Sequence, residues 1–327
     1  MPIDYYVAWW NLENLFDVEG SPRRTDKLAR TIGNDIAGWT QALLDRKVDQ
    51  LARVIAQMNG GRGPDLLGAC EIENAFVMDL LIANLHNRLP GRQYARVHAD
   101  TSDQRGIDVA FIYDSQLLSV DPAAIFQHIV MRRTATRELL QVNFETALHR
   151  TWTVFANHWP SRSGGQFESN GYRAIAGETL AYFHQRTRQV LGDKAPVLAM
   201  GDFNDEPFDD SLVRYALSTR QRQRVISARI PLLWNLMWGR TGAAEGTFYF
   251  ENLPNLLDQF LVNENMAQST SPFQAQANTV EILRFPGMVA PGNYPKPVPF
   301  GGMGKPVNQN GFSDHFPIGM VVRESDG

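Results

Sequence analysis

Four segments of the sequence end an apolar run with side chains that could bind a metal ion or move a proton. In VLAMGDFNDEP, Asp202, Asn204 and Asp205 follow such a run. Alternate residues of a strand share one face, so Asp202 and Asn204 are expected to point the same way. The aspartate could take a proton from an attacking water while the amide orients that water. The alternative is an ordinary turn, where both residue types are common.

The segment GFSDHFPIGMVV places Asp314 and His315 directly before a predicted strand near the C-terminus. A protonated histidine can stabilise the negative charge that develops on a phosphoryl group. A carboxylate usually orients such a ring, and Asp258, at the head of the apolar run LDQFLV, is the candidate. An ordinary hydrogen-bonded histidine and a strand-capping aspartate are the alternatives.

The segment GACEIEN ends with Glu71 and Glu73, which would share a face if the strand continued. Asn11, in WWNLENLFD, has the same strand-end position and could contribute its amide oxygen. Carboxylate and amide oxygens form a hard donor set, which favours Mg²⁺, Mn²⁺ or Ca²⁺ over zinc. The alternative for Glu73 and Asn74 is that they cap a helix, because helical apolar residues follow them.

The segment TVFANHWPSRSGG carries His158 at the end of an apolar run and Arg162 in the following loop. His158 could protonate a leaving oxygen or hydrogen-bond a phosphoryl oxygen, although a histidine beside Trp159 is often only packed. Arginine can hold a phosphate through paired hydrogen bonds. The candidate substrate-binding residues, including two from DQRGIDVAFIY, are Arg105, Asp108, Asn157, Arg162 and Arg173.

The elements that must position these side chains are mostly strands. Runs rich in β-branched and aromatic residues recur as YYVAWW, DLLGAC, IDVAFIY, LLQVNF, TWTVFANHW, PVLAMGDF, LDQFLV and FPIGMVV. Apolar residues at helical spacing predict helices across 48–58 and 180–190. Many strands with few helices indicate a sheet-dominated α/β or α+β architecture. No repeat or linker divides the chain, so we expect a single domain over residues 1–327.

The composition limits the classes of function. The chain has 327 residues, 43% of them hydrophobic, and a net charge of −4, which argues against coating nucleic acid by bulk electrostatics. A single cysteine excludes an internal disulfide and a cysteine-based zinc site. No signal-like start or run of about 18 apolar residues is present. We therefore expect a cytoplasmic protein, or a secreted one if a signal peptide has been removed.

The segment 285–312 contains the run FPGMVAPGNYPKPVPFGGMGKP, whose proline and glycine density predicts a long loop without regular structure. Because it leads directly into Asp314 and His315, it could form one wall of an active site. The alternative is an excursion over the surface.

The motifs occur in an order that resembles the endonuclease/exonuclease/phosphatase superfamily, whose members include deoxyribonuclease I-like nucleases. The series is NLENLFD, EIEN, RGIDVAFIY, NHWPSR, GDFNDEP, LDQFLV and SDHFPI, and it spans nearly the whole chain. The resemblance is nearest to the bacterial predicted-nuclease branch. It implies a four-layered α/β/β/α sandwich of two mixed β-sheets flanked by helices, with the active site at one edge of the sheets.

The resemblance also implies metal ligands. Glu71 would be the principal ligand, Asn11 its neighbour in the metal shell, and Asp314 a second metal-binding or proton-handling group. The family often has Leu-Gln before the metal-binding glutamate, whereas Ala69 and Cys70 occupy those places here. Oxidation of Cys70 could then disturb the metal site.

The resemblance assigns the catalytic steps to five residues. Asp202 and Asn204 would orient the nucleophilic water, His315 would stabilise the transition state, and Asp258 would orient His315. His158 is similar to the second histidine of the nuclease and sphingomyelinase branches. The expected reaction is in-line attack of water on a phosphodiester with Mg²⁺, or with Mn²⁺ or Ca²⁺, and without a covalent intermediate.

A nucleic acid is the expected substrate, without a protein partner and with the chain as a monomer. Two basic runs could contact phosphates, although such runs are more often solvated surfaces: Arg220, Arg222, Arg224 and Arg229, and Arg132, Arg133 and Arg137. The alternative substrate is a small or lipid-derived phosphoester, as in inositol phosphatases or sphingomyelinases, with Tyr294 and Phe300 facing an apolar group. A non-catalytic binding module is disfavoured because every catalytic position holds a competent residue.

Overall fold

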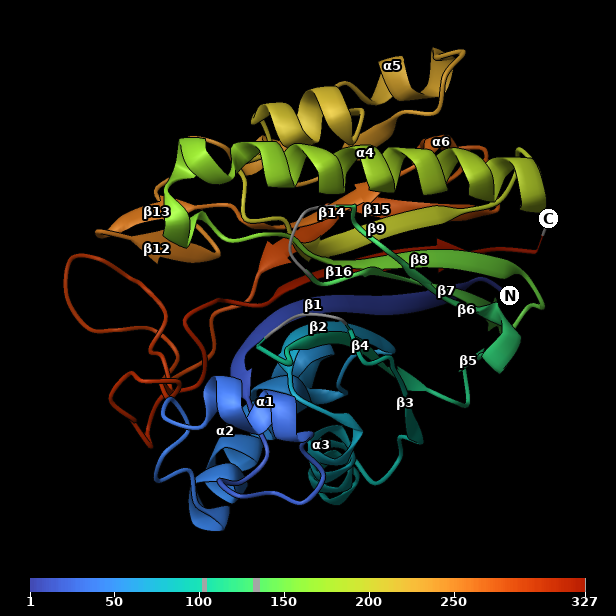
Figure 1. The fold of residues 1–327 in the computed structure, drawn as a ribbon. Coiled ribbons are helices and arrows are strands. Elements are labelled where there is room, and N and C mark those ends of the chain that lie inside the picture. Colours follow the sequence, from blue (N-terminus) through green and yellow to red (C-terminus); the bar gives the residue numbers. More distant parts are fainter. Residues whose placement is uncertain (102–104, 132–135, 327) are drawn as a thin grey trace.

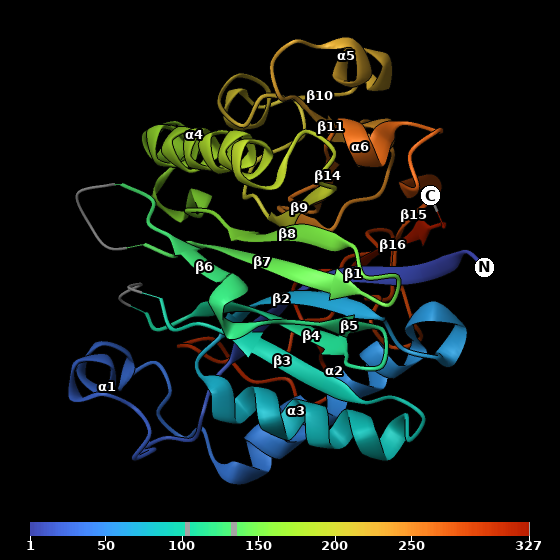
Figure 2. The ribbon, with the colours of Figure 1, turned by 90° about the vertical axis from the view of Figure 1, so that its right-hand side faces the viewer.

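Two β-sheets pack face to face in the centre of the molecule, and helices cover the outer face of each sheet (Figures 1 and 2). The computed structural model describes residues 1–101, 105–131 and 136–326. The layers follow the order helix, sheet, sheet, helix. This arrangement confirms the predicted four-layered α/β/β/α sandwich.

The first sheet is built around the N-terminal strand. Strand β1 is antiparallel to β16 and parallel to β2, so the sheet is mixed as expected. In spatial order the strands are β15 (Phe273–Ile282), β16 (Ile318–Glu324), β1 (Ile3–Leu15), β2 (Leu66–Ile72), β4 (Asp108–Asp114) and β3 (Tyr94–His98). The two ends of the chain therefore meet in one sheet.

The second sheet is also mixed, because β8 and β9 are parallel while β14 is antiparallel to β9. Strand β6 (Ile125–His128) pairs with β7 off the main path. In spatial order the other strands are β10 (Ser218–Thr219), β11 (Leu233–Asn235), β14 (Asp258–Val262), β9 (Val197–Asp202), β8 (Thr151–His158), β7 (Leu139–Thr146) and β5 (Leu118–Ser119). A separate hairpin joins β12 (Phe248–Phe250) to β13 (Leu253–Asn255).

The helices form the two outer layers. Helices α2 (Gln41–Gly61) and α3 (Ala75–Arg88) cover the first sheet, with α1 (Asp26–Ile32) beside them. Helices α4 (Gln166–Leu191), α5 (Arg222–Ser227) and α6 (Glu264–Ala267) cover the second sheet. Four short turns complete the chain: η1 (Pro122–Ala124), η2 (Arg162–Gly164), the π-helical η3 (Ser211–Tyr215) and η4 (Trp238–Arg240). In the described part of the chain, no helix combines the length and apolar character that crossing a bilayer requires.

Strand β1 is buried on both faces and joins two hydrophobic cores. Its alternate residues Tyr5, Val7 and Trp9 pack between the two sheets. The intervening residues Tyr6, Ala8 and Trp10 pack against α2 and α3. This alternation follows from the pleat of the strand and explains why the YYVAWW run is almost wholly apolar.

The segment from 285 to 312 contains no helix or strand, as its proline and glycine content predicts. It is anchored at two places on the first half of the chain. The buried Lys47 ammonium of α2 donates to the Phe312 carbonyl at 2.7 Å, and the Phe300 N–H donates to the Glu13 carboxylate at 2.7 Å. The Phe300 ring is fully buried against the edge of Trp39. The loop is therefore fastened to α2 and to the end of β1.

Two glycines provide a test of how tightly the second sheet is packed. A side chain on Gly201 would collide with the backbone of Asn157 in the neighbouring strand, whereas one on Gly171 of α4 would meet nothing. We expect Gly201→Ala to destabilise the protein by about 1–3 kcal/mol, as overpacking does. Gly171→Ala should instead stabilise it by about 0.5–1 kcal/mol, because alanine favours a helix. Urea unfolding measures both, and equal effects of the two changes would contradict the packing argument.

Candidate active site

The predicted catalytic residues converge at one edge of the two sheets. In the second sheet, Asp202 is directly opposite Asp258 of β14 on one side and His158 of β8 on the other. Strands β1 and β2 of the first sheet bring Asn11 and Glu71 to the same edge, where both side chains come within hydrogen-bonding distance of each other. Residues from five strands and from the segment before β16 thus form one cluster.

His315 is held by a buried carboxylate, as predicted. Its Nδ1 lies 2.7 Å from Asp258 Oδ2, while Trp9 donates to the other carboxylate oxygen at 2.9 Å. Burial alone would lower the pKa of His315, but the charges of Asp258 and Asp202 and the hydrogen bond to Asp258 raise it well above its usual range. His315 is therefore a cation at neutral pH.

The backbone around His315 is fastened to β1. The Ser313 hydroxyl donates to the Asn11 carbonyl at 2.6 Å and accepts the His315 N–H at 3.1 Å. The Trp10 indole donates to the His315 carbonyl at 2.9 Å. The Phe248 ring lies 4.9 Å from the imidazole, centroid to centroid. Sequence reasoning missed these supports, since no local pattern links residues about 300 positions apart.

Asp202 lies at the centre of the cluster. Its Oδ2 accepts a hydrogen bond from the Asn11 amide at 3.1 Å and lies 3.8 Å from His158 Nε2 and 3.9 Å from His315 Nε2. Burial raises the pKa of Asp202 to about 7; the Asp258 charge adds to this rise and the His315 charge opposes it. The carboxyl group can therefore gain or lose a proton near neutral pH.

Glu71 is the most open carboxylate of the cluster, with 18% of its side chain exposed. It accepts hydrogen bonds from Asn11 Nδ2 at 3.3 Å and from the Asn14 N–H at 3.1 Å. The expected shared face of Glu71 and Glu73 is wrong, because Glu71 has a φ of 63° and the register shifts there. Glu73 instead forms a buried ion pair with Arg24 at 2.7 Å. Asn74 caps α3, the alternative we considered for it.

The donor set fits a divalent cation. Glu71 and Asp202 approach the same Asn11 amide and the same His158 nitrogen, so two carboxylates converge on groups that carry no charge. Oxygen ligands of this kind suit a hard ion. The Asn11 oxygen accepts the Glu13 N–H at 3.0 Å, so the amide would have to turn over before that oxygen could ligate a metal.

His158 is a neutral imidazole in this environment. Burial lowers its pKa well below the usual range, and the positive charges of Arg137, Arg105 and His315 lower it further. Its Nε2 is 3.8 Å from both Glu71 and Asp202, while Nδ1 has no hydrogen-bond partner among the described residues. The side chain can therefore donate a hydrogen bond into the cluster without adding a charge.

Asn204 does not share an extended face with Asp202, because it has a left-handed φ of 51°. Its N–H donates to Asp202 Oδ1 at 3.0 Å, and its amide nitrogen donates to the Trp159 carbonyl at 3.0 Å. The turn thus fixes the Asp202 carboxylate directly. The amide oxygen accepts no hydrogen bond from the described residues and remains free to orient a water.

The predicted phosphate contacts of Arg162 and Arg173 do not fit the structure. Arg173 is fully buried and forms an ion pair with Asp205 at 2.7 Å. Arg162 pairs with Asp205 at 3.0 Å and with Asp209 at 2.7 Å, and donates to the Asn204 carbonyl. Both arginines therefore hold the turn after Asp202. Sequence spacing could not reveal this, because the partner carboxylates of Arg162 lie 43 and 47 positions away in the chain.

Asn157 and Asp108 are likewise buried and fully engaged, which corrects their expected contact with substrate. The Asn157 amide bonds to the carbonyls of Phe155 and Met200 and accepts from the Trp159 indole. Asp108 bonds to His98 at 3.0 Å and to the Thr101 N–H at 2.8 Å.

The two remaining candidates lie at the rim of the cluster. Asp314 is 3.7 Å from Lys305 and lies outside the Asp202, Asp258 and His315 group, so a metal-binding role for it remains a prediction. Arg105 is exposed and close enough to His158 to lower its pKa. Cys70 is fully buried, and burial raises the pKa of its thiol well above the usual range, which disfavours its oxidation.

The raised pKa of Asp202 makes the metal-free protein sensitive to pH. The fold favours the neutral carboxyl, so this contribution to stability is full below pH 3.8 and is lost as pH rises to about 7. With EDTA present at pH 8, Asp202→Asn should be more stable than the parent by roughly 1–3 kcal/mol, and its stability should fall less between pH 4 and 7. Urea unfolding measures this, with the exposed Asp193→Asn as control. Parallel pH profiles of the parent and Asp202→Asn would contradict the assignment.

Known proteins share both the sequence family and the fold. A sequence profile described as Endonuclease/Exonuclease/phosphatase family matches residues 6–324. A family protein from Bacteroides thetaiotaomicron is similar, with a TM-score of 0.57, 15% identity and coverage of 100% of both chains. The human Nocturnin catalytic domain with bound sulfate has a TM-score of 0.55 and 15% identity, over 99% of this chain and 97% of that one. A Bacteroides thetaiotaomicron mannosyl-6-phosphatase has a TM-score of 0.54 and 15% identity, over 97% of this chain and 99% of that one.

A comparison with curated proteins finds no match. The structural similarities, at 15% identity, establish the shared fold. The profile match covers both ends of the chain, including every motif that carried the resemblance. The chain therefore belongs to the endonuclease/exonuclease/phosphatase family.

Proposed function

We propose that this phosphoesterase hydrolyses phosphodiesters, with nucleic acid as its substrate and Mg²⁺ as its ion. The observation that carries the proposal is the small number of side-chain cations in the cluster. His315 is a cation, His158 is neutral, and the guanidinium groups of Arg162 and Arg173 are occupied by Asp205 and Asp209.

The charge of the substrate distinguishes a diester from a monoester. A phosphodiester carries one negative charge, whereas a monoester carries about −1.5 to −2 at pH 7. With His315 protonated and Mg²⁺ bound, the negative charges of Glu71, Asp202 and Asp258 would only just be balanced, so the cluster offers little excess positive charge for the second negative charge of a monoester. This balance supports a diester substrate.

Each side chain of the cluster has its own role in the proposed reaction. Asp202 accepts the proton of the attacking water, and the Asn204 amide oxygen orients that water. His315, kept protonated by Asp258, stabilises the charge that develops on the phosphoryl oxygens. Neutral His158 donates a hydrogen bond to the same group. Glu71, with Asp202, would hold the divalent ion, which when bound supplies further neutralisation of this charge.

A polymeric substrate is supported by Arg105, which is exposed beside the cluster and could contact a neighbouring phosphate. The basic run of α5 offers less support. Arg222 donates to the Ala267 carbonyl and packs over Trp234, and α5 belongs to the outer layer above α4 (Figure 1). Arg137 is buried and donates to the His158 carbonyl. Arg132 and Arg133 lie outside the described residues.

A small or lipid-derived phosphoester is the second candidate, and an apolar surface favours it. Phe208, Phe250 and Leu253 are 52%, 62% and 66% exposed on the segments that follow Asn204 and form the β12–β13 hairpin. Tyr294 is also exposed, whereas Phe300 is buried, which corrects its expected contact with an apolar group. Similarity to a mannosyl-6-phosphatase keeps a monoester substrate under consideration.

A matched pair of substrates tests the charge argument. We expect the protein with Mg²⁺ to hydrolyse bis-p-nitrophenyl phosphate at least about tenfold faster, in kcat/KM, than p-nitrophenyl phosphate. Turnover should stop with EDTA and fall strongly in Glu71→Gln. Single-stranded DNA, duplex DNA and RNA should then be cleaved, with KM rising steeply with salt. A preference for the monoester would refute the diester proposal, and cleavage of sphingomyelin alone would favour the second candidate.

The His315–Asp258 pair can be tested separately. We expect His315→Ala to lower kcat by about 10²–10³-fold while KM changes little, because the charge of the imidazolium acts on the transition state. Asp258→Asn should lower kcat less and shift the basic limb of the pH profile to lower pH, since the carboxylate keeps His315 protonated. Steady-state kinetics measures both. Near-normal kcat in folded His315→Ala would contradict the assignment.

A further inference from the structure

A cavity lies in the outer layer over the second sheet, between η3, β10 and the segment after α5. Its volume is about 270 Å³, and its lining is Val213, Arg214, Leu217, Ser218, Thr219, Arg224, Ile230, Leu232 and Trp238. None of these residues belongs to the Asp202 cluster. Whatever the cavity holds is therefore separate from the proposed reaction.

The lining combines apolar walls with positive charge. Two arginines and no carboxylate face the cavity. Arg224 forms no ion pair or hydrogen bond with the described residues, and Arg214 has only an exposed pair with Asp210, at 3.1 Å. Exposed pairs of this kind are weak. The two guanidinium groups can therefore bind an anion.

One buried polar group in the wall lacks a partner. Ser218 is 2% exposed, and its hydroxyl makes no hydrogen bond with the described residues. A buried hydroxyl without a partner destabilises the fold, so native proteins rarely keep one without a ligand or water. The preceding residue, Leu217, has a φ of 55°, which is rare for a leucine. Both residues belong to the lining of the cavity, but the Ser218 oxygen is itself covered by neighbouring atoms, so it marks an unsatisfied group behind the wall and not a contact for a ligand.

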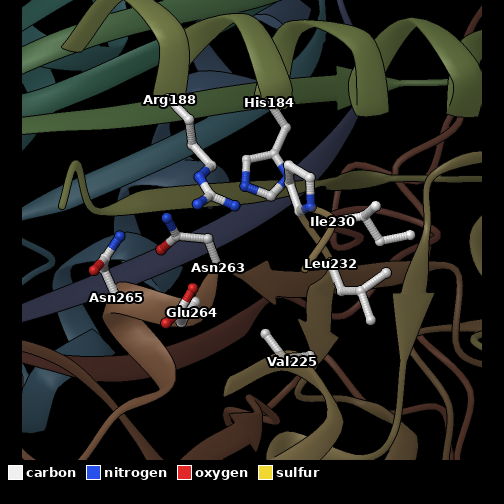
Figure 3. A pocket seen from close by; sticks show the side chains of 9 residues that line it. His184, Arg188, Val225, Ile230, Leu232, Asn263, Glu264 and Asn265 are labelled. Atoms are coloured by element: carbon white, nitrogen blue, oxygen red, sulfur yellow. The ribbon is translucent and has the colours of Figure 1, made fainter. Parts of the chain in front are cut away.

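A neighbouring pocket differs from this cavity in its size and in its charged residues (Figure 3). It shares Ile230 and Leu232 with the cavity and is also lined by His184, Arg188 and Glu264. It has no room for a water molecule. His184 is fully buried there, and burial lowers its pKa to about 3, so it carries no charge. Of the two, only the larger cavity combines room for a ligand with an arginine that has no side-chain partner among the described residues.

We propose that the larger cavity binds a small organic anion, with an apolar body of about two fused rings and one sulfonate, carboxylate or phosphate group. An apolar cavity of about 150 Å³ holds benzene, so a cavity of 270 Å³ has room for a bicyclic body. Ile230, Leu232 and Trp238 contact the rings, and Arg224 and Arg214 hold the anion.

Two fluorescent probes that differ by one charge test the proposal on the whole chain. They are 8-anilinonaphthalene-1-sulfonate and its neutral analogue N-phenyl-1-naphthylamine. We expect one saturable site that prefers the sulfonate, with non-fluorescent 1-naphthalenesulfonate as a competitor. Arg224→Gln should weaken sulfonate binding about tenfold and change binding of the neutral probe less than about twofold. The matched control is Arg229→Gln, which removes an exposed arginine of the same segment that does not line the cavity.

Three results would overturn the proposal. The first is the absence of a saturable site for the sulfonate. The second is equal weakening by Arg224→Gln and Arg229→Gln, which would show attraction to a basic surface in general. The third is equal affinity for the sulfonate and for the neutral probe, which would show that the two arginines do not hold the anion. Circular dichroism verifies that both variants are folded, which is expected because Arg224 and Arg229 are exposed.

Discussion

The structure around the cluster depends on how two buried carboxylates, paired across neighbouring strands, are stabilised. Asp202 and Asp258 face each other across antiparallel strands and are almost inaccessible to solvent. Buried like charges are tolerated only where other groups compensate them. His315 supplies a positive charge between them, Trp9 donates to one carboxylate, and Asn11 donates to the other. These three partners come from opposite ends of the chain, so the fold must close before the carboxylates are stabilised.

Strand β1 brings these partners together because it packs into both hydrophobic cores of the molecule. One of its faces packs between the sheets and the other packs on α2 and α3, while its end contributes Asn11 to the cluster. Behind the cluster, the buried pair of Arg173 and Asp205 fixes the turn that carries Asn204. Breaking such a pair typically costs about 3–5 kcal/mol. The geometry of the Asp202 cluster is therefore maintained by buried contacts outside it.

The sequence predicted the fold class and the residues that converge, because apolar runs and the side chains that end them are local patterns. It could not predict what depends on distant partners or on backbone angles. Glu71 and Asn204 interrupt the alternation of an extended strand through positive φ angles. Arg173 forms an ion pair with the buried carboxylate of Asp205. Phe300, in a segment rich in proline and glycine, is buried by contact with Trp39. Very short strands such as β10 and β11 exist only through their pairing with neighbours.

The π-helix η3 connects the turn after Asp202 to the outer cavity. Ser211 at its start donates to Asp205 at 2.5 Å, and Val213 and Arg214 further along it line the cavity. A ligand alters a distant site only if that site has a second arrangement which the ligand favours. Asp205 is fixed by Arg162, Arg173 and Ser211 together, so a second arrangement would have to break several buried contacts at once. Occupation of the cavity should therefore raise resistance to unfolding while leaving the geometry around Asp202 unchanged.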